Sequence, residues 1–493
     1  MYVIGIDVGT TGTKAMLIND KGIVLKSAYR GYGIIKSGRN MVEQKAEDWW
    51  NSLVETVKEC IQDVNDRYNI LALSISSQGG SLVPVDKEGN PLSNVIVWMD
   101  KRGIDQQNDL LNLHPGEFYY KKTGWKLSPG GNLIQIKWLK ENASDLFEGT
   151  YKFLSTLDFI NFKLTGRYVI DPTNGAMTHL IDINRGLWDE ELLSAAGINE
   201  KKLAEVMEPG LAVGELAASA AEELGLGTTV KVINGGHDQY CAAVGAGAIE
   251  EGELFLSTGT AWVLLGTFKQ PVFDLDTYIA PGRHIVNNLW GGLVSVPTGG
   301  VSMEWFKDNF ASESFRDIDN KASLLMKRAE NVFFYPYFNG SGYPNYNPNV
   351  KASLMGLGLE HDRYDMALAI MEGVAFEINH AIEEFRNKGC KTGHLRMLGG
   401  GSKSNLWTEI IANVTGAPVL RFKETEAACI GAAIIAGVGC GIFPDYRDGY
   451  TSIMREEILT EADKNKSEFY REKYAMYKQG IKFIEEYYNK IFN

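Results

Sequence analysis

The chain has little cysteine and no long hydrophobic run, and both shortages argue against a secreted or membrane protein. Its five cysteines, at positions 60, 241, 390, 429 and 440, are scattered and form no Cys-x-x-Cys pair. Such a set is typical of buried thiols in a reducing compartment. The longest uncharged run, residues 427–443, contains four glycines, and a membrane-spanning helix needs roughly 20 apolar residues. We therefore expect a cytoplasmic protein, and we interpret this run as a buried helix followed by a turn. Because a strand-like run begins at residue 2, we also expect no signal peptide.

Positive charge is in short supply as well. The 62 acidic residues outnumber the 49 basic ones, which gives a formal net charge of −13. An acidic surface repels the nucleic-acid backbone and anionic lipid headgroups, so we expect neither nucleic acid nor membrane as a partner. A phosphorylated ligand is still allowed, because a local nest of backbone amides can bind one on an acidic protein. The seven histidines and five cysteines show no zinc-site spacing.

Two common phosphate-binding motifs are also missing, GxxxxGK[ST] and GxGxxG. In their place the strand-like run 2–7 leads into Val8-Gly9-Thr10-Thr11-Gly12-Thr13-Lys14. Glycine lets backbone N–H groups approach a phosphate closely. Hydroxyls at such a turn can hold phosphate oxygens, and Asp7 can hold Mg²⁺ through water. A hairpin turn without any ligand explains the same residues, so this turn alone decides nothing.

The second half of the chain repeats this layout. Residues 253–266 again form an apolar run, a Thr/Gly turn (Ser257-Thr258-Gly259-Thr260) and a second apolar run. A chain of 493 residues is too long for one hydrophobic core. We therefore predict two duplicated domains, 1–247 and 248–493, with the two turns clamping phosphates between them. We interpret the strand and glycine-rich turn at 395–404 as the equivalent of 230–238.

Short apolar runs between residues 2 and 30 predict an antiparallel meander. Residues 103–230 are mostly helical in pattern, with an expected strand pair around 166–184. The segment from Tyr470 to Ile491 has one apolar helix face. We expect that face to pack on the chain's own second domain, and a homodimer seam is the alternative.

The stretch Asn234-Gly235-Gly236-His237-Asp238-Gln239 lies near the middle of the chain. It follows an apolar strand-like run and precedes a run of small residues, which predicts a strand, a glycine turn and a helix start. Asp238 then lies in the first helical turn, where a carboxylate is favoured. A capping aspartate gives the same pattern, so a capping role and a catalytic role for Asp238 both stay open. We interpret His237 as a turn histidine, with an acid/base role as the alternative.

Together these motifs resemble the FGGY family of carbohydrate kinases, within the actin-like ATPase superfamily, over almost the whole chain. The sharpest match is Ala352-Ser-Leu-Met-Gly356-Leu357, followed after seven residues by Asp365 to Glu372. Further landmarks are Val42-Glu43-Gln44 before Trp49-Trp50, Trp98-x-Asp100-x-Arg102, and Tyr335 to Gly340. The layout is most similar to xylulokinases. One N-terminal signature is met only in part, because Gln135 stands where the family has a lysine.

The resemblance implies an α/β fold of two duplicated ribonuclease H-like (actin-like ATPase) domains, each a mixed sheet with flanking helices, with an active-site cleft between them. It implies that domain 1–247 binds the sugar and carries the catalytic aspartate, and that domain 248–493 binds the nucleotide. ATP would be the phosphate donor, Mg²⁺ the cofactor and a small sugar or polyol the acceptor.

The resemblance also assigns roles to single residues. Asp238 would be the general base and Asp7 would orient Mg²⁺ through water. The implied nucleotide-binding residues are Thr10, Thr11, Gly12, Lys14, Thr258, Gly259, Gly300, Gly401 and Asn405. The implied substrate-binding residues are Gln78, Gly79, Trp98, Asp100, Asp238 and Gln239. Trp98 could equally belong to the core, and Arg102 could simply orient Asp100.

The acceptor is the most open question. The loop Gln78-Gly79-Gly80 offers backbone and space, unlike the usual xylulokinase and glycerol kinase versions. We favour a xylulose-type ketopentose, with glycerol, erythritol, ribulose or a gluconate-like acid as alternatives. A non-catalytic ATP-binding sugar sensor is a third hypothesis, but a sensor has no need of a base.

Overall fold

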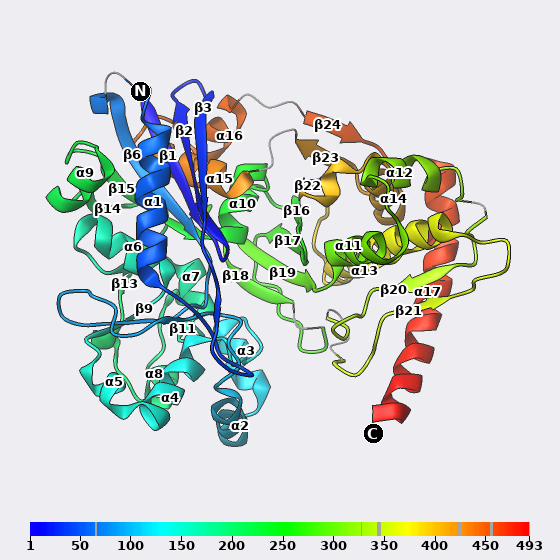
Figure 1. Cartoon of the computed structure of the whole chain (residues 1–493), viewed down its shortest axis with the longest axis horizontal. Coiled ribbons are helices and arrows are strands. Elements are labelled where there is room, and N and C mark those ends of the chain that lie inside the picture. Colours follow the sequence, from blue (N-terminus) through cyan, green and yellow to red (C-terminus); the bar gives the residue numbers. More distant parts are fainter. Residues whose placement is uncertain are drawn as a thin grey trace. The chain divides into compact units, whose positions relative to one another are not determined.

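The computed structural model describes residues 1–64, 67–277, 279–326, 328–342, 347–422, 426–453 and 457–492. The chain forms two compact units, and neither is one continuous stretch (Figure 1). The first unit comprises Met1–Ile249, Pro281–Trp290 and Glu426–Met454, and the second comprises Glu250–Ala280, Gly291–Thr425 and Arg455–Asn493. The boundary between residues 247 and 248 stays a prediction. By packing, two segments from later in the chain also belong to the first unit.

The first unit is built on a mixed sheet with the strand order β14-β15-β6-β1-β2-β3 (Figure 1). Strands β1 (Tyr2–Val8), β2 (Gly12–Asn19) and β3 (Val24–Gly31) form the predicted antiparallel meander. Strands β6 (Ile70–Ser77) and β15 (Lys231–His237) run parallel to β1, and β14 (Ala212–Glu215) closes the edge. The three central strands β1, β6 and β15 are nearly continuous runs of buried residues, as expected of sheets covered by helices.

Helix α15 (Ala427–Gly439) packs against this sheet although it comes late in the chain. A Cβ added to Gly5 of β1 would lie 1.9 Å from the carbonyl oxygen of Cys429. Gly431 in turn lies against helix α10 (Asp238–Ala246), where an added Cβ would be 1.8 Å from the carbonyl oxygen of Cys241. Small residues therefore allow backbone-to-backbone contact. The run 427–443 is the predicted buried helix and turn, and no helix among the described residues is long and apolar enough to cross a membrane.

The second sheet has seven strands, with β18 (Ala280–Arg283) at one edge. Beside β18, a block of six strands repeats the first sheet strand for strand, in the order β19-β17-β16-β22-β23-β24. Its members are β16 (Leu254–Thr258), β17 (Trp262–Phe268), β19 (Trp290–Val296), β22 (Leu395–Gly399), β23 (Val419–Phe422) and β24 (Glu457–Thr460). β16 pairs antiparallel with β17 and parallel with β22, as β1 pairs with β2 and β6. The predicted duplication is confirmed, including the match of 253–266 to the first hairpin.

Two predictions about strands were wrong. Residues 395–399 take the place of β6 in the second sheet, beside its first strand, so they are not the equivalent of 230–238. The pair expected around 166–184 does not form either. Instead, β10 (Val169–Ile170) pairs with β13 (Glu205–Val206), and β11 (Ile181–Asp182) pairs with β12 (Leu187–Trp188). Helix α7 (Pro172–Met177) lies between β10 and β11 in the chain, begun by an Asp171 cap and a proline at its first position.

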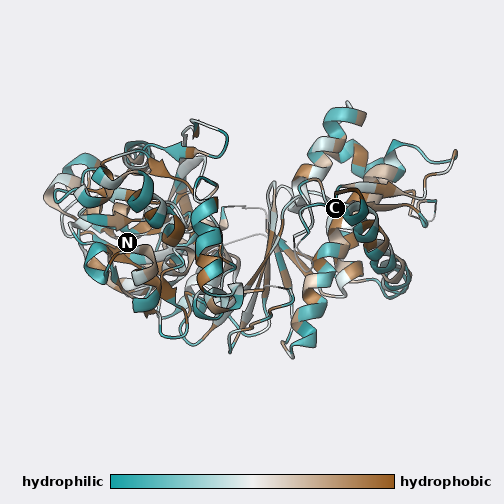
Figure 2. Cartoon of the chain, turned by 90° about the horizontal axis from the view of Figure 1, so that it is seen from below, coloured by the Kyte–Doolittle hydropathy of each residue, from teal (hydrophilic) through white to brown (hydrophobic). Residues whose placement is uncertain are grey.

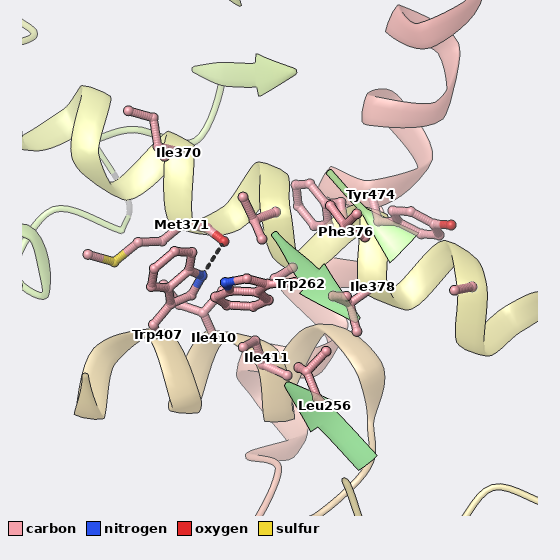
Figure 3. Packing of buried hydrophobic residues seen from close by; sticks show 14 of the residues in the cluster. Leu256, Trp262, Ile370, Met371, Phe376, Ile378, Trp407, Ile410, Ile411 and Tyr474 are labelled. Carbon is pink, nitrogen blue, oxygen red and sulfur yellow. Dashed lines mark hydrogen bonds between the residues drawn. The ribbon is translucent and has the colours of Figure 1, made fainter. Parts of the chain in front are cut away.

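The core of the second unit lies where helices α13 (Arg363–Asn387), α14 (Asn405–Thr415) and α17 (Lys464–Phe492) meet its sheet (Figure 3). Phe376 of α13 contacts Tyr474 and Tyr477 of α17. As expected, α17 packs on its own unit through a buried face of Tyr470, Tyr474, Tyr477, Ile481 and Ile484. Ile491 is exposed, and the helices show both hydrophilic and hydrophobic stretches in Figure 2.

The remaining elements support these two sheets. The other strands are β4 (Ile35–Lys36), β5 (Val42–Gln44), β7 (Val83–Val85), β8 (Val95–Ile96), β9 (Lys152–Leu154), β20 (Phe333–Tyr335) and β21 (Ser353–Met355). The other helices are α1 (Ala46–Cys60), α2 (Ile104–Leu113), α3 (Gly116–Thr123), α4 (Asn132–Asn142), α5 (Ser144–Gly149), α6 (Thr156–Thr165), α8 (Glu190–Ala196), α9 (Ala218–Leu224), α11 (Gly299–Phe310), α12 (Phe315–Ala322) and α16 (Tyr446–Ser452).

Candidate active site

Three predicted site residues meet at one edge of the first sheet. β6 lies between β1 and β15, and all three run in the same direction, so their carboxyl ends meet at this edge. Asp7 pairs in register with Ser76, and His237 pairs with Ser77. The residues that follow, Gln78 and Asp238, therefore emerge beside Asp7. Ligands of open α/β sheets commonly bind at such carboxyl ends.

Asp238 is the first residue of α10, as predicted, and its side chain is 31% exposed. The backbone before it is fixed from the side, because the His237 N–H donates to the Thr173 hydroxyl at 2.8 Å. Thr173 itself is held by Asp171, the buried N-cap of α7. The His237 Nδ1 lies 3.4 Å from a carboxylate oxygen of Asp238, and it makes no hydrogen bond within the described part of the chain. The backbone that carries the Asp238 carboxylate is thus held in place, and the carboxylate is accessible.

Asp7 lies close enough to Asp238 for the two carboxylates to repel each other. Burial first, and the Asp238 charge second, raise the pKa of Asp7 to about 7, while the Ser76 hydroxyl and Lys14 oppose the shift. Ser76 donates to Asp7 Oδ1 at 2.7 Å. Neighbouring carboxylates of this kind attract a cation. The described residues hold no cluster of three or more His, Cys, Asp or Glu side chains suited to a metal. A site with few protein ligands suits Mg²⁺, which keeps water and takes substrate phosphates as ligands.

The β1–β2 turn and the expected sugar-binding residues share one hydrogen-bond network. The Thr10 hydroxyl donates to Gln78 Oε1 at 2.9 Å and accepts from Trp98 Nε1 at 3.2 Å. Gln44 Nε2 donates to the Thr10 carbonyl at 2.6 Å. Trp98 is 47% exposed. It therefore does not belong to the core, and a large part of its indole is open to a ligand.

The rest of that turn is fixed by its neighbours. A Cβ on Gly12 would lie 2.5 Å from the Tyr29 ring, so this position needs glycine. Thr11 is exposed, and its carbonyl accepts from the Tyr29 hydroxyl at 3.2 Å. Lys14 forms an ion pair with Glu426, which precedes α15. Its charge is therefore already partly neutralised.

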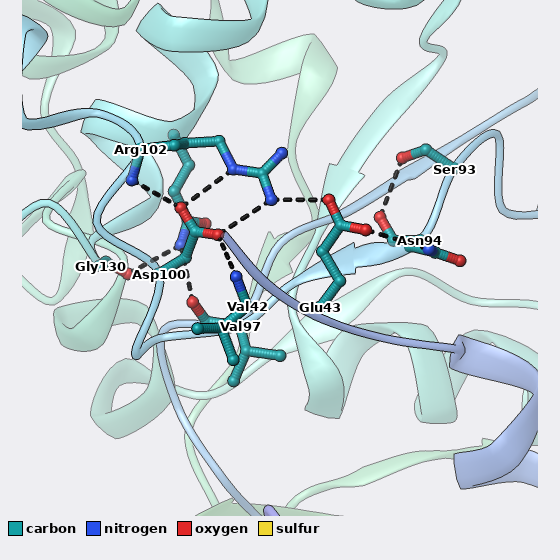
Figure 4. Close-up of polar contacts among 9 residues, drawn as sticks. Val42, Glu43, Ser93, Asn94, Val97, Asp100, Arg102 and Gly130 are labelled. Carbon is teal, nitrogen blue, oxygen red and sulfur yellow. Dashed lines mark hydrogen bonds and ion pairs between the residues drawn. The ribbon is translucent and has the colours of Figure 1, made fainter. Parts of the chain in front are cut away.

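Asp100 is buried and fully hydrogen-bonded (Figure 4). One carboxylate oxygen accepts from Arg102 N and Nε at 2.8 and 2.9 Å. The other accepts from Val42 N at 2.7 Å and Arg102 Nη2 at 2.9 Å. Arg102 also donates to Glu43 at 2.6 Å. This network ties the segment after Trp98 to β5, so the expected supporting role of Arg102 fits, while a direct sugar contact from Asp100 would have to replace one of these bonds.

The loop after Gln78 is less roomy than expected. A Cβ on Gly79 would lie 2.5 Å from Met177 Cγ and 2.7 Å from His237 Cδ2. The space beside Gly79 is therefore already filled by these two side chains, contrary to the prediction of open space. Gln239 Oε1 is buried and has no hydrogen-bond partner among the described residues. A ligand hydroxyl could satisfy it.

In the second unit a cavity of about 1020 Å³ brings together Thr258, Gly259, Gly300, Gly401 and Asn405. The Thr258 hydroxyl donates to the Leu398 carbonyl at 2.6 Å, which joins β16 to β22. A Cβ on Gly300 would lie 2.2 Å from the Gly259 carbonyl oxygen, and one on Gly401 would lie 2.6 Å from the Trp262 ring. Turn, helix start and glycine-rich loop therefore meet without side chains between them. This suits a phosphate chain bound by backbone N–H groups.

Two models of one protein family together match most of the chain. Residues 2–245 match the N-terminal domain of the FGGY family of carbohydrate kinases, and residues 254–440 match its C-terminal domain. The chain belongs to the FGGY family. It is therefore a carbohydrate kinase with the two-domain, actin-like fold, and its substrates are ATP and a sugar.

Relatives of this FGGY kinase carry more than one acceptor in their names. The xylulose kinase of Bacillus subtilis (strain 168) is 28% identical over 479 residues, covering 97% of this chain and 96% of that one. A ligand-bound xylulose kinase from Lactobacillus acidophilus has a similar structure, with a TM-score of 0.93, 25% identity and 99% of each chain covered. A gluconate kinase from Lactobacillus acidophilus gives a TM-score of 0.92, also with 25% identity and 99% of each chain covered.

Sequence reasoning missed several residues of this FGGY kinase that line or brace the two sites. Ser76 holds Asp7, and Thr173 holds the start of α10. The cavity of the second unit is also lined by Asp319 of α12 and by Trp407, which donates to the Met371 carbonyl at 2.9 Å (Figure 3). A single serine or aspartate carries no signal of its own in the sequence. Of these residues, only Ser76 could have been found, from its place at the end of a predicted strand.

Proposed function

We propose that this enzyme transfers the γ-phosphate of ATP to a hydroxyl of a small open-chain sugar or polyol, with a xylulose-type ketopentose as first choice. The observation that carries the proposal is the meeting of Asp7, Gln78 and Asp238 at the ends of three adjacent parallel strands. The glycine-walled cavity of the second unit supports it, since it suits the nucleotide. In this proposal domain 1–247 binds the sugar and domain 248–493 binds ATP.

Asp238 is the proposed general base. Its carboxylate is accessible at the first turn of α10 and accepts the proton of the attacking hydroxyl. Such a base contributes about 10²–10⁴-fold to the rate. Most of the remaining catalysis in phosphoryl transfer is positioning and charge stabilisation. Trp98, Gln78 and Gln239 would orient the acceptor.

The phosphates are proposed to contact both glycine turns. Thr10, Thr11 and Gly12 hold phosphate oxygens on the first unit, while Thr258 and Gly259 do so on the second. Mg²⁺, held through water by Asp7, would supply positive charge against the phosphate oxygens. Gly300, Gly401 and Asn405 bound the adenosine. Lys14 contributes through its pair with Glu426 rather than as a free charge.

Charge at the acceptor site favours a neutral sugar over a gluconate-like acid. The two cations nearest to Trp98 in sequence are Lys101 and Arg102. Lys101 is exposed, whereas the side chain of Arg102 is 7% exposed. Asp100 and Glu43 both pair with its guanidinium. An anionic acceptor would thus find Arg102 already neutralised. Gluconate, glycerol, erythritol and ribulose stay as alternatives.

An acceptor panel tests the function. We expect ADP release in the presence of Mg-ATP to rise at least tenfold on adding D-xylulose, and to rise less with D-ribulose, glycerol, erythritol or D-gluconate. A folded protein that binds ATP and responds to none of these would support the sugar-sensor hypothesis instead. A strongest response to D-gluconate would overturn the charge argument at Arg102.

The base assignment has its own test. Asp238→Asn keeps the size of the side chain but removes the proton acceptor, so we expect kcat to fall about 10²–10⁴-fold while the Kd for ATP changes less than about twofold. Glu215→Gln, on the exposed edge strand β14, is the matched control and should retain full activity. An active Asp238→Asn enzyme would refute the role.

A further inference from the structure

The nucleotide cavity contains a carboxylate that the proposed function does not use. Asp319 lies on α12, is half-buried and lines the cavity together with Ser404 and Asn405. Burial raises the pKa of Asp319, and a side-chain hydrogen bond with Ser404 opposes the shift. Ser404 is the N-cap of α14, where its hydroxyl accepts from the Trp407 N–H at 2.9 Å. The carboxylate is therefore anchored at the start of α14. A carboxylate is a poor neighbour for phosphates, so it belongs at the nucleoside end.

The adjacent Asn405 has a fixed orientation. Arg421 Nη1 donates to Asn405 Oδ1 at 2.9 Å and to the Ser402 carbonyl at 3.0 Å. Because a guanidinium can only donate, the amide oxygen must face Arg421. The Asn405 amide nitrogen has no hydrogen-bond partner among the described residues and is left as a donor. Among the groups that line the cavity, the start of α14 thus brings together an acceptor, Asp319, and a donor, the Asn405 amide.

We propose, resting on the kinase function above, that Asp319 and Asn405 together read the purine edge and select ATP over inosine and guanosine triphosphates. Adenine offers an amino donor at position 6 beside a ring-nitrogen acceptor, which matches a carboxylate beside an amide donor. Hypoxanthine and guanine carry an oxygen at position 6, which would face the carboxylate oxygens. Asp319 is the discriminating group, because the ring nitrogen N7 is an acceptor in all three bases and can accept from the amide donor in each case.

The test compares ATP with ITP, whose base has an oxygen in place of the amino group at position 6 and a proton on N1. For the full-length enzyme we expect kcat/KM for ATP to exceed that for ITP at least tenfold with a saturating acceptor. Asp319→Asn should lower this ratio tenfold or more, since the amide can turn its N–H₂ toward the oxygen at position 6. Asp317→Asn lies on the same helix but outside the cavity lining, and it should leave the ratio unchanged.

Binding of non-hydrolysable ATP and ITP analogues, measured by calorimetry, gives a readout that does not depend on transfer. An unchanged ATP/ITP ratio in Asp319→Asn would overturn the proposal while leaving the kinase function intact. An equal loss for both nucleotides would also overturn it, because it would place the carboxylate at the ribose. If no nucleotide supports transfer in the wild type, the kinase function fails, and the binding ratio alone still decides the role of Asp319.

Discussion

At the scale of single residues, the Asp7 carboxyl lowers the free energy of unfolding. Its ordinary pKa is 3.8, and the folded protein raises it to about 7. Between those values the folded state holds a proton that the unfolded chain has released. Stability from this group therefore falls as pH rises from about 4 to about 7, and is lowest above that range. This loss of stability is consistent with a role for Asp7 in holding a cation rather than in stabilising the fold.

We therefore expect Asp7→Asn to stabilise the ligand-free protein at pH 8 by about 1–3 kcal/mol, with the gain shrinking toward zero near pH 4. The neutral amide can still accept from Ser76, and it removes the repulsion with Asp238. Thermal unfolding at several pH values measures the difference. Magnesium-dependent transfer should fall in the same variant. A stability difference that is the same at every pH would contradict the assignment.

The sequence was most informative about residues at the ends of strands. Asp238 was placed at a helix start because the pattern around it is local: an apolar run, two glycines and then small residues. The sequence did not predict that both carboxylate oxygens of Asp100 already accept hydrogen bonds, or that side chains fill the space beside Gly79. Both depend on partners such as Val42 and Met177, which are distant in the chain. Asp319 was missed for the same reason.

At the scale of elements, the turn between β16 and β17 depends on the start of α11. The Val301 N–H donates to the Thr260 carbonyl at 3.1 Å, which locks the two together. The hairpins and their turns were predicted correctly because they are contiguous in sequence. The place of β22 was wrong because its pairing with β16 is parallel and long-range, and the strand pattern alone does not say which neighbour it joins.

The close contact between the start of α11 and the β16–β17 turn predicts different outcomes for substitutions at Gly300 and at Gly259. Gly300→Ala would put a methyl group 2.2 Å from the Gly259 carbonyl oxygen, so we expect a loss of about 1–3 kcal/mol of stability and weaker ATP binding. Gly259→Ala meets only the Ala261 carbonyl at 3.6 Å, and its stability should stay within about 0.5 kcal/mol of wild type. Denaturant unfolding compares them. Equal losses would show that the close approach does not matter.

At the scale of the whole molecule, the duplication was readable from sequence, but the packing of the two units was not. Segments Pro281–Trp290 and Glu426–Met454 belong to the first unit although the second surrounds them in the chain. Nothing in the composition of 427–443 distinguishes a helix for one unit from a helix for the other. Close contacts with Gly5 and with α10 are what place this helix in the first unit.

Hydrogen exchange tests the assignment of the sugar to the first unit and of the adenosine part of ATP to the second. A non-hydrolysable ATP analogue alone should slow exchange in the β16–β17 turn and at the starts of α11 and α14, because these line the cavity. The sugar alone should slow exchange around residues 78–80 and 237–240. A bound ligand slows amide exchange by making local opening rarer. The ATP analogue and the sugar should therefore protect different sets of amides. Sugar protection confined to the second unit would contradict the assignment.

The late return of α15 to the first sheet also bears on how the protein is made. Until residues 427–439 have been made, the N-terminal sheet lacks the helix that packs against β1 and α10, and these surfaces stay uncovered. A fragment that ends near residue 249 therefore lacks a helix that covers its own sheet, and we expect it to aggregate more readily than the full chain.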